Sequence, residues 1–236
     1  MDLKTYSGPQ AEQIDLSARK ILFRNVYLWM TLALVITGIT SLIVAFSPNL
    51  TQLVYGNSFV FYGLLIGELA LVWYLASRIN KLSFTTATMF FILYSVLNGV
   101  TISFIFLIYT GASIAATFFV TAGTFGVMAL IGTFTKKDLS SWGNILLMAL
   151  VGLIIASIVN IFLKSPAFYW IITYAGVIIF VGLTVYDAQK IKKSIDAHGN
   201  EINETTQKIA LMGALSLYLD FINLFLYLLR ILGSRR

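Results

Sequence analysis

Three acidic residues lie within long apolar stretches of the sequence: Glu68, Asp187 and Asp220. A carboxylate costs ~2.5–3.5 kcal/mol at the centre of a membrane helix, so an acid in that position is expected to serve a function and to face the interior of a helix bundle. Asp220 comes about 12 residues after Lys208, which is ~18 Å along a helix, and Glu68 is ~15 Å from Arg78. Both acids are therefore predicted to lie deep in the membrane.

Asp187 and Asp220 belong to consecutive apolar stretches, which adjacent helices can bring together. Two carboxylates in a low-dielectric site cannot both ionise cheaply, so a close pair shares one proton and titrates as a unit. A change in its protonation can then bias a two-state helix arrangement. Two structural alternatives stay open. Asp187 lies three residues before Lys190 and is compatible with an ordinary interfacial position, and Asp220 is compatible with a buried structural hydrogen bond.

The composition indicates that these acids are carried by membrane helices. Of 236 residues, 58% are hydrophobic and 11% are charged, against roughly 25% charged in soluble domains. The long apolar stretches are residues 26–46, 59–77, 84–109, 112–134, 143–163, 167–187 and 209–232. Each has the ~20 residues needed to cross a hydrocarbon core, and their continuity excludes a β-barrel. We predict an all-α polytopic membrane protein, with a polar cytoplasmic N-terminal tail (1–25) and a single transmembrane helical domain (26–236).

The charges between the stretches predict the orientation. Bases gather in the N-terminal tail and around Lys81, Lys137 and Lys193, whereas residues 47–58 and 110–111 carry no charge. By the positive-inside rule the basic segments, the N-terminus included, are cytoplasmic. A seventh full span would place Arg235 and Arg236 outside, against this bias, and a re-entrant last segment would keep them inside. We predict a full seventh helix, because residues 211–232 contain only two charges and no proline.

Several classes of protein are excluded. The sequence has no cysteine, so it has neither a disulfide framework nor a thiolate nucleophile. The basic residues sit between apolar stretches and form no patch for nucleic acid. Residues 1–22 are polar and mixed in charge, which is not typical of a cleavable signal peptide. The absence of cysteine and the short connections favour a bacterial inner (cell) membrane.

Four segments resemble those of the transmembrane Bax inhibitor motif family, the Bax-inhibitor-like membrane proteins, in its bacterial type. These segments are Arg24-Asn25-Val26-Tyr27, residues 132–140 (GTFTKKDLS), Tyr186-Asp187-Ala188-Gln189 and residues 216–225 (SLYLDFINLF). The similarity extends over nearly the whole chain beyond Ala18, and the last two segments together are specific.

The resemblance implies a seven-helix fold in which the C-terminal helix is surrounded by the other six. It also implies a calcium leak gated by pH through two aspartates on the last two helices, which correspond to Asp187 and Asp220. Position within the second apolar stretch adds Arg78 as the cationic partner and Glu68 as a polar pore residue. Calcium is then the transported ion, on a path past the three acids, and no cofactor or catalytic residue is expected. Residues 190–207 form a long loop between the aspartates, which is a departure from the family.

Two rival functions stay open, and one is excluded. An intramembrane aspartyl protease also uses two aspartates that share a proton. That class expects Gly-x-Gly-Asp at its second site, where this chain has Tyr218-Leu219-Asp220. A membrane regulator that transports nothing and acts by contact with other membrane proteins is the second rival. A retinal photoreceptor needs a Schiff-base lysine in the last helix, and residues 209–229 contain none.

Overall fold

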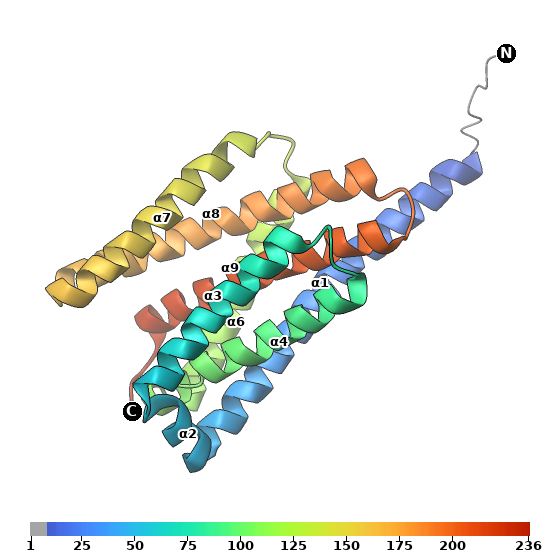
Figure 1. Ribbon diagram of the computed structural model, residues 1–236. Helices are drawn as coiled ribbons and strands as arrows, with labels where there is room; N and C mark the ends of the chain where they lie inside the picture. Colours follow the sequence, from blue (N-terminus) through green and yellow to red (C-terminus); the bar gives the residue numbers. More distant parts are fainter. Residues whose placement is uncertain (1–8) are drawn as a thin grey trace.

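The computed structural model describes residues 9–236, and in this range it consists of helices joined by short connections (Figure 1). The helices are α1 (Pro9–Phe46), α2 (Pro48–Tyr55), α3 (Ser58–Arg78), α4 (Phe84–Ile102), α5 (Ile105–Ile108), α6 (Gly111–Phe134), α7 (Ser140–Leu163), α8 (Pro166–His198) and α9 (Glu204–Leu232). Seven of them are long and apolar enough to cross a membrane, all except α2 and α5. The predicted seven-helix membrane fold is therefore confirmed.

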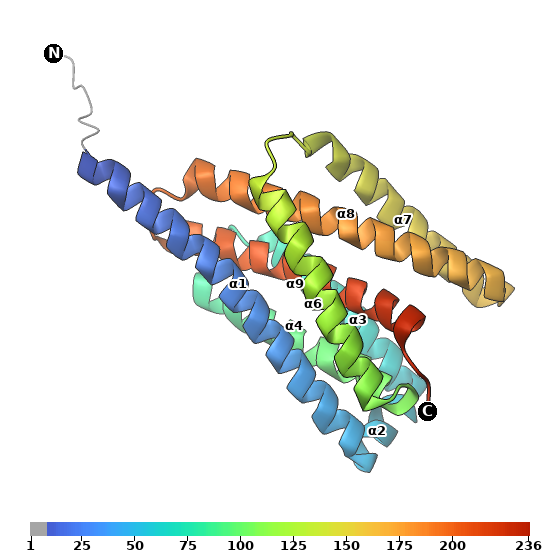
Figure 2. The ribbon, with the colours of Figure 1, turned by 180° about the vertical axis from the view of Figure 1, so that it is seen from behind.

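The last helix, α9, lies at the centre of the bundle (Figures 1 and 2). In its most apolar 18-residue window 67% of the residues are buried, against 11% for both α3 and α7. It packs directly on α1, α4, α6 and α8, while α3 packs mainly on α4 and α7 on α8. A helix buried on nearly all sides has no lipid-facing stripe, so any polar group on it must find its partner inside the protein.

The C-terminal tail shows that α9 crosses the whole bundle and does not turn back. After the helix ends at Leu232, the backbone N–H of Thr110 donates to Ser234 O at 3.0 Å. The N–H of Arg236 donates to Ile108 O at 2.9 Å. The chain therefore ends beside the α5–α6 turn, at the opposite end of the bundle from the start of α1 (Figure 1). The re-entrant alternative does not describe this fold.

The loop predicted between the aspartates is much shorter than residues 190–207. Helix α8 continues to His198 and α9 begins at Glu204, which leaves residues 199–203 as the connection. Helix α8 continues because its apolar positions Ile191 and Ile195 recur every four residues on the buried face. Asn203 then starts α9 with a capping box, in which its side chain and that of Thr206 each accept from the other's backbone N–H at 3.0 Å.

The boundary predicted at residue 25 also shifts. Helix α1 runs without a break from Pro9 to Phe46, and Ala18 and Leu22 are buried within the bundle. The polar positions of this segment face outward, where Arg19 contacts Asp196 of α8 at 3.6 Å. Residues 18–25 therefore belong structurally to the helical domain. Of the predicted tail, residues 1–8 lie outside the described part of the chain.

The third predicted span, residues 84–109, is divided into α4 and α5 at Ser103 and Phe104. Such a break frees backbone groups that lipid cannot satisfy. The phenol oxygen of Tyr55, at the end of α2, lies 3.0 Å from both Val100 O and Thr101 O and accepts the N–H of Phe104 at 2.9 Å. One side chain thus supplies the partners that the interrupted helix lacks.

Helices α6 and α8 approach so closely that only a glycine fits between them. A methyl group at Gly132 of α6 would overlap the carbonyl oxygen of Val185 in α8 and lie 2.9 Å from the side chain of Ala188. Gly123, also on α6, faces open space instead, with no atom within 4 Å of the corresponding position. In membranes small residues allow helices to pack at this distance.

We therefore expect Gly132→Ala to destabilise the protein by ~1–3 kcal/mol, because backbone on α8 must move to admit the methyl group. Thermal unfolding of the purified protein in detergent would measure this as a lower midpoint. Gly123→Ala is the matched control and should leave the midpoint unchanged or slightly raised. Equal midpoints for the two variants would contradict the close α6–α8 contact.

Candidate functional site

Asp220 is the most deeply placed acid of the described chain. It lies near the middle of α9 with 4% of its surface exposed. Its Oδ2 is buried and has no hydrogen-bond partner among the described residues. The neighbouring Phe221 ring packs against Phe118 and Phe125 of α6, with ring centroids 5.4 Å apart in both cases. A buried carboxyl without a partner is costly in this apolar setting, so Asp220 is not explained by a structural hydrogen bond.

Asp187 lies on the adjacent helix α8 and is half-buried. It interacts electrostatically with Asp220, so the structure brings the two predicted residues into the same region. No hydrogen bond joins their carboxyl groups among the contacts of residues 9–236. The expected hydrogen-bonded contact is thus not made in this conformation, and its formation in another conformation stays a prediction.

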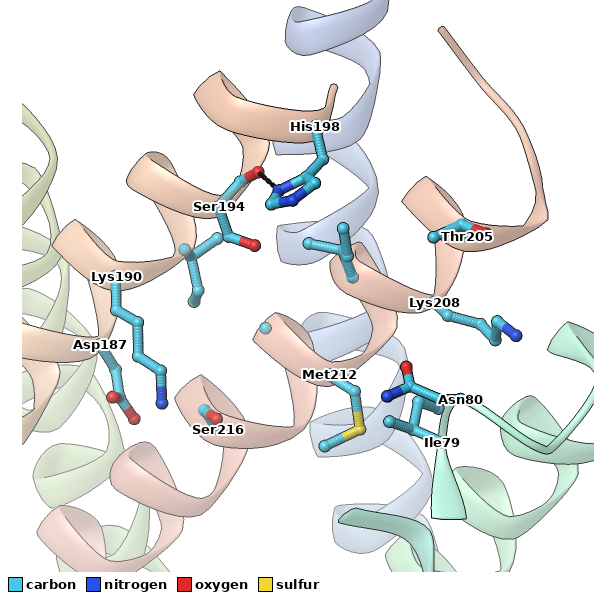
Figure 3. Close-up of a pocket in the computed structure, with 13 residues that line it drawn as sticks. Ile79, Asn80, Asp187, Lys190, Ser194, His198, Thr205, Lys208, Met212 and Ser216 are labelled. Atoms are coloured by element: carbon cyan, nitrogen blue, oxygen red, sulfur yellow. Dashed lines mark hydrogen bonds between the residues drawn. The ribbon is translucent and has the colours of Figure 1, made fainter. Parts of the chain in front are cut away.

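Asp187 also lines a cavity of about 650 Å³ between α8, α9 and the α3–α4 turn (Figure 3). The lining residues are Ile79, Asn80, Asp187, Lys190, Ile191, Ser194, His198, Thr205, Lys208, Ile209, Met212, Gly213 and Ser216. The cavity lies at the end of the bundle that holds the α8–α9 connection. Asp220 is one helical turn beyond Ser216 and is not in the lining. The cavity therefore reaches Asp187 but not Asp220.

The predicted cation, Arg78, is exposed at the end of α3 and forms no ion pair with any described residue. Its neighbours Ile79 and Asn80 reach the cavity instead. The cation that interacts electrostatically with Asp187 is Lys190, one turn further along α8. The spacing of three residues on one helix predicts that Asp187 and Lys190 lie close together. In the sequence, however, Lys190 also fits the pattern of a basic residue that follows a membrane span.

Glu68 lies apart from the aspartates, in a different polar cluster. It is 7% exposed and accepts a hydrogen bond from Thr101 Oγ1 of α4 at 2.7 Å. Thr101 Oγ1 also lies 3.0 Å from the carbonyl oxygen of Asn98. The Asn98 side chain in turn accepts from the Tyr218 hydroxyl at 3.1 Å. Glu68 is therefore connected to α9 through α4, on the side away from Asp187.

Tyr218 is the residue of α9 that joins this second cluster. It is fully buried, and its hydroxyl lies 2.8 Å from Thr37 Oγ1 of α1. Thr37 Oγ1 also contacts Ser95 O of α4 at 2.9 Å. Tyr218 and Asp220 are two residues apart and thus point to opposite sides of α9. Sequence reasoning missed Tyr218, Asn98 and Thr37, because a tyrosine, an asparagine or a threonine is common in a membrane helix and gives no signal alone.

The two segments of the family motif, residues 132–140 and 186–189, meet in the structure. The Gln189 side chain accepts from Leu139 N at 2.8 Å and donates to Lys137 O at 2.7 Å. Asp138 pairs with Lys193, and this ammonium holds the pKa of the Asp138 carboxyl well below its usual range. The α6–α7 turn is therefore fixed to α8 directly beside Asp187. Lys137, Asp138 and Gln189 therefore position the helix that carries Asp187, and they do not themselves line the cavity.

A second cavity lies on the far side of Asp220 from the first. This cavity, of about 330 Å³, lies near the other end of the bundle and is lined by Tyr109, Tyr169 and Arg230 among others. It has no lining residue in common with the first. Between the two, the Phe118 ring packs against Phe221 and Phe225 of α9. The cavity that reaches Asp187 and this second cavity are therefore separate among the described residues.

Known proteins similar to this chain come from bacteria, and one of them is named as an inner membrane protein. The family model described as "Inhibitor of apoptosis-promoting Bax1" matches residues 19–236. The inner membrane protein YbhL of Escherichia coli K12 is 52% identical over 212 residues, which cover 90% of this chain and 91% of the relative. An uncharacterised protein of Borreliella burgdorferi is 43% identical over 230 residues, with 94% and 99% covered. A Rickettsia prowazekii protein, RP147, is 41% identical over 212 residues, with 90% and 89% covered.

The hydrogen bonds of Tyr218 generate a prediction on stability. Tyr218→Phe removes one hydroxyl and leaves Asn98 Oδ1 without its buried donor, so we expect a loss of ~1–3 kcal/mol. Tyr94→Phe is the matched control, since that buried ring also packs on Tyr218, at 6.0 Å, and its hydroxyl has no hydrogen-bond partner among the described residues. Thermal unfolding in detergent should separate the two variants, and a larger loss for Tyr94→Phe would refute the assignment.

Proposed function

This chain belongs to the Bax inhibitor-like family of membrane proteins, and on that premise we propose that it is a pH-sensitive, calcium-permeable leak channel of the bacterial inner membrane. Protonation of the Asp187–Asp220 pair sets the balance between closed and open arrangements of the helices. The observation that carries the proposal is the unpartnered, buried carboxyl of Asp220, beside an acid that lines a cavity.

The position of the pair supports a role in gating. Asp220 lies at the middle of the central helix, and Asp187 lies where protons and ions arrive from the cavity. When both acids are ionised, their repulsion in an apolar site favours separation of α8 and α9, and a shared proton favours a close pair. Because α8 and α9 pack extensively on each other, such a shift moves the central helix relative to α6.

The chemistry of the site supports calcium as the transported ion. Calcium prefers carboxylate, carbonyl and water oxygens, and accepts them in flexible geometry. The cavity offers the Asp187 carboxylate with hydroxyls and amide groups at Ser194, Ser216 and Asn80. In this proposal the rings of Phe118, Phe221 and Phe225, which pack against one another along α9, part when the channel opens. Glu68 lies at the middle of α3 and contributes a further buried acid, on the side of α9 away from Asp187.

Replacing either aspartate tests the proposal. Asp187→Asn and Asp220→Asn each remove one titrating group and keep the size of the side chain. Calcium flux into liposomes that contain either variant should lose most of its dependence on pH between about 6 and 8, where a buried carboxyl pair exchanges its proton. Only the slope is diagnostic, because asparagine can favour either arrangement. Glu201→Gln, in the exposed α8–α9 connection, is the control and should keep the slope of the parent.

Full pH dependence in both buried variants would place the sensor elsewhere, with Glu68 as the next residue to test. A parent protein that conducts no calcium above protein-free liposomes would remove the channel altogether and favour a regulator that acts by contact. Peptide cleavage that both asparagine variants abolish would instead favour the protease.

The orientation in the membrane is a separate prediction. Reporter fusions after Lys81, Lys137 and Lys193 should report the cytoplasm, and fusions after Asn57 and Gly111 the opposite side, because bases are retained in the cytoplasm. A reporter at Arg236 should agree with Gly111, since the C-terminal tail pairs with the α5–α6 turn. A cytoplasmic signal from Arg236 together with an external one from Gly111 would contradict this arrangement.

A further inference from the structure

The cavity beside Asp187 contains more positive than negative charge. Lys190, Lys208 and Asp187 are the lysines and acids of its lining. Glu204 lies beside Lys208 and offsets its charge, whereas Lys190 acts on Asp187 itself, where an ammonium repels an approaching divalent cation. This is unexpected in a site proposed to pass calcium, so the lysines require an explanation.

The two lysines differ in how they are held. The Lys208 ammonium donates to the carbonyl oxygen of Leu82 at 3.1 Å and lies 3.9 Å from Glu204. Lys190 has neither a hydrogen bond nor an ion pair with any described residue, and its ammonium lies 5.9 Å from the ring of Tyr186. Lys208 is therefore bonded to the α3–α4 turn, while no such bond holds the Lys190 ammonium, which can move within the cavity.

Figure 3 shows where that free ammonium points. The side chains of Asp187 and Lys190 lie side by side on α8, and both point toward Ser216 of α9. Lys208 extends to the opposite side of the cavity, toward Asn80. Lys190 is the cation whose charge acts on Asp187, although no ion pair within 4.0 Å forms. Its flexible chain can hold the ammonium over the carboxylate or withdraw it toward solvent.

We infer that Lys190 is a rate- and affinity-determining residue of this site, a tethered counter-ion that calcium must displace from Asp187 before it can pass. The inference rests on the proposed calcium leak. While the ammonium stays near Asp187, it offsets the carboxylate charge and blocks the approach. A divalent cation has twice the charge and competes for the same oxygens, so displacement becomes favourable as calcium rises. The residue thus limits the leak at low calcium.

Calcium flux into liposomes tests the inference with three variants. Lys190→Met keeps the length of the side chain without the charge, and should raise the initial rate at sub-saturating calcium roughly three- to ten-fold at low ionic strength. The gain should shrink at high salt, because screening weakens the repulsion in the parent. Lys190→Arg keeps the positive charge and should show the same rate as the parent. Lys192→Met, on the same helix and outside the cavity lining, is the matched control and should leave the rate unchanged.

Calcium binding to the detergent-solubilised protein, measured by calorimetry, gives a readout that does not need transport. Lys190→Met should bind calcium more tightly than the parent, by roughly the same factor as the change in rate, and Asp187→Asn should bind more weakly. Unchanged affinity and rate in Lys190→Met, in a parent that conducts calcium, would overturn the inference and leave the channel standing. If Lys192→Met raises the flux rate as much as Lys190→Met does, the effect comes from the general surface charge and the inference is overturned. A parent that neither binds nor conducts calcium would overturn both.

Discussion

The structure depends on one constraint, which is that a helix buried at the centre of a membrane bundle must satisfy its polar groups inside the protein. Helix α9 satisfies that constraint on one side only. Tyr218 has hydroxyl and amide partners from α1 and α4, and these join three helices through short hydrogen bonds. Asp220, on the other side, has a carboxylate oxygen without a hydrogen-bond partner in the described part of the chain. Hydrogen bonds therefore hold the central helix to α1 and α4. The Asp220 carboxyl lies on its other side, toward α6 and α8.

The electrostatic arrangement differs from one end of the bundle to the other. The cavity that reaches Asp187 has lysines at its rim, and the adjacent α6–α7 turn is fixed by Gln189 and by the pairing of Asp138 with Lys193. The other end has few charges, and Arg230 there lies over the rings of Tyr169 and Tyr227. Charge is thus concentrated at the end of the bundle where the cavity reaches Asp187. The aromatic rings along α9 separate this side from the rest.

Much of the fold could be predicted because the bilayer restricts a chain to long apolar helices, and seven such stretches are visible in the sequence. Asp187 and Asp220 stood out for the same reason, since acids are rare in that setting. Features that depend on contacts between distant segments could not be predicted. The break between α4 and α5 relies on Tyr55, which is 45 residues or more away in sequence. The pairing of Arg78 is expected from its position along α3, but Arg78 is exposed at the helix end and forms no ion pair with any described residue. Lys190 looked like any basic residue that follows a span, because its neighbours in space were unknown.

The attachment of α9 at its two ends has a mechanical consequence. At one end a five-residue connection joins the helix to α8, and the capping box of Asn203 fixes the first turn of α9. At the other end the tail is bonded through its backbone to the α5–α6 turn. A rod that is fixed at both ends and pushed from the side does not slide along its axis, and it is displaced most at its midpoint. Asp220 is near that midpoint, so a change of charge there acts where the helix is easiest to bend and where the rings of α6 lie against it.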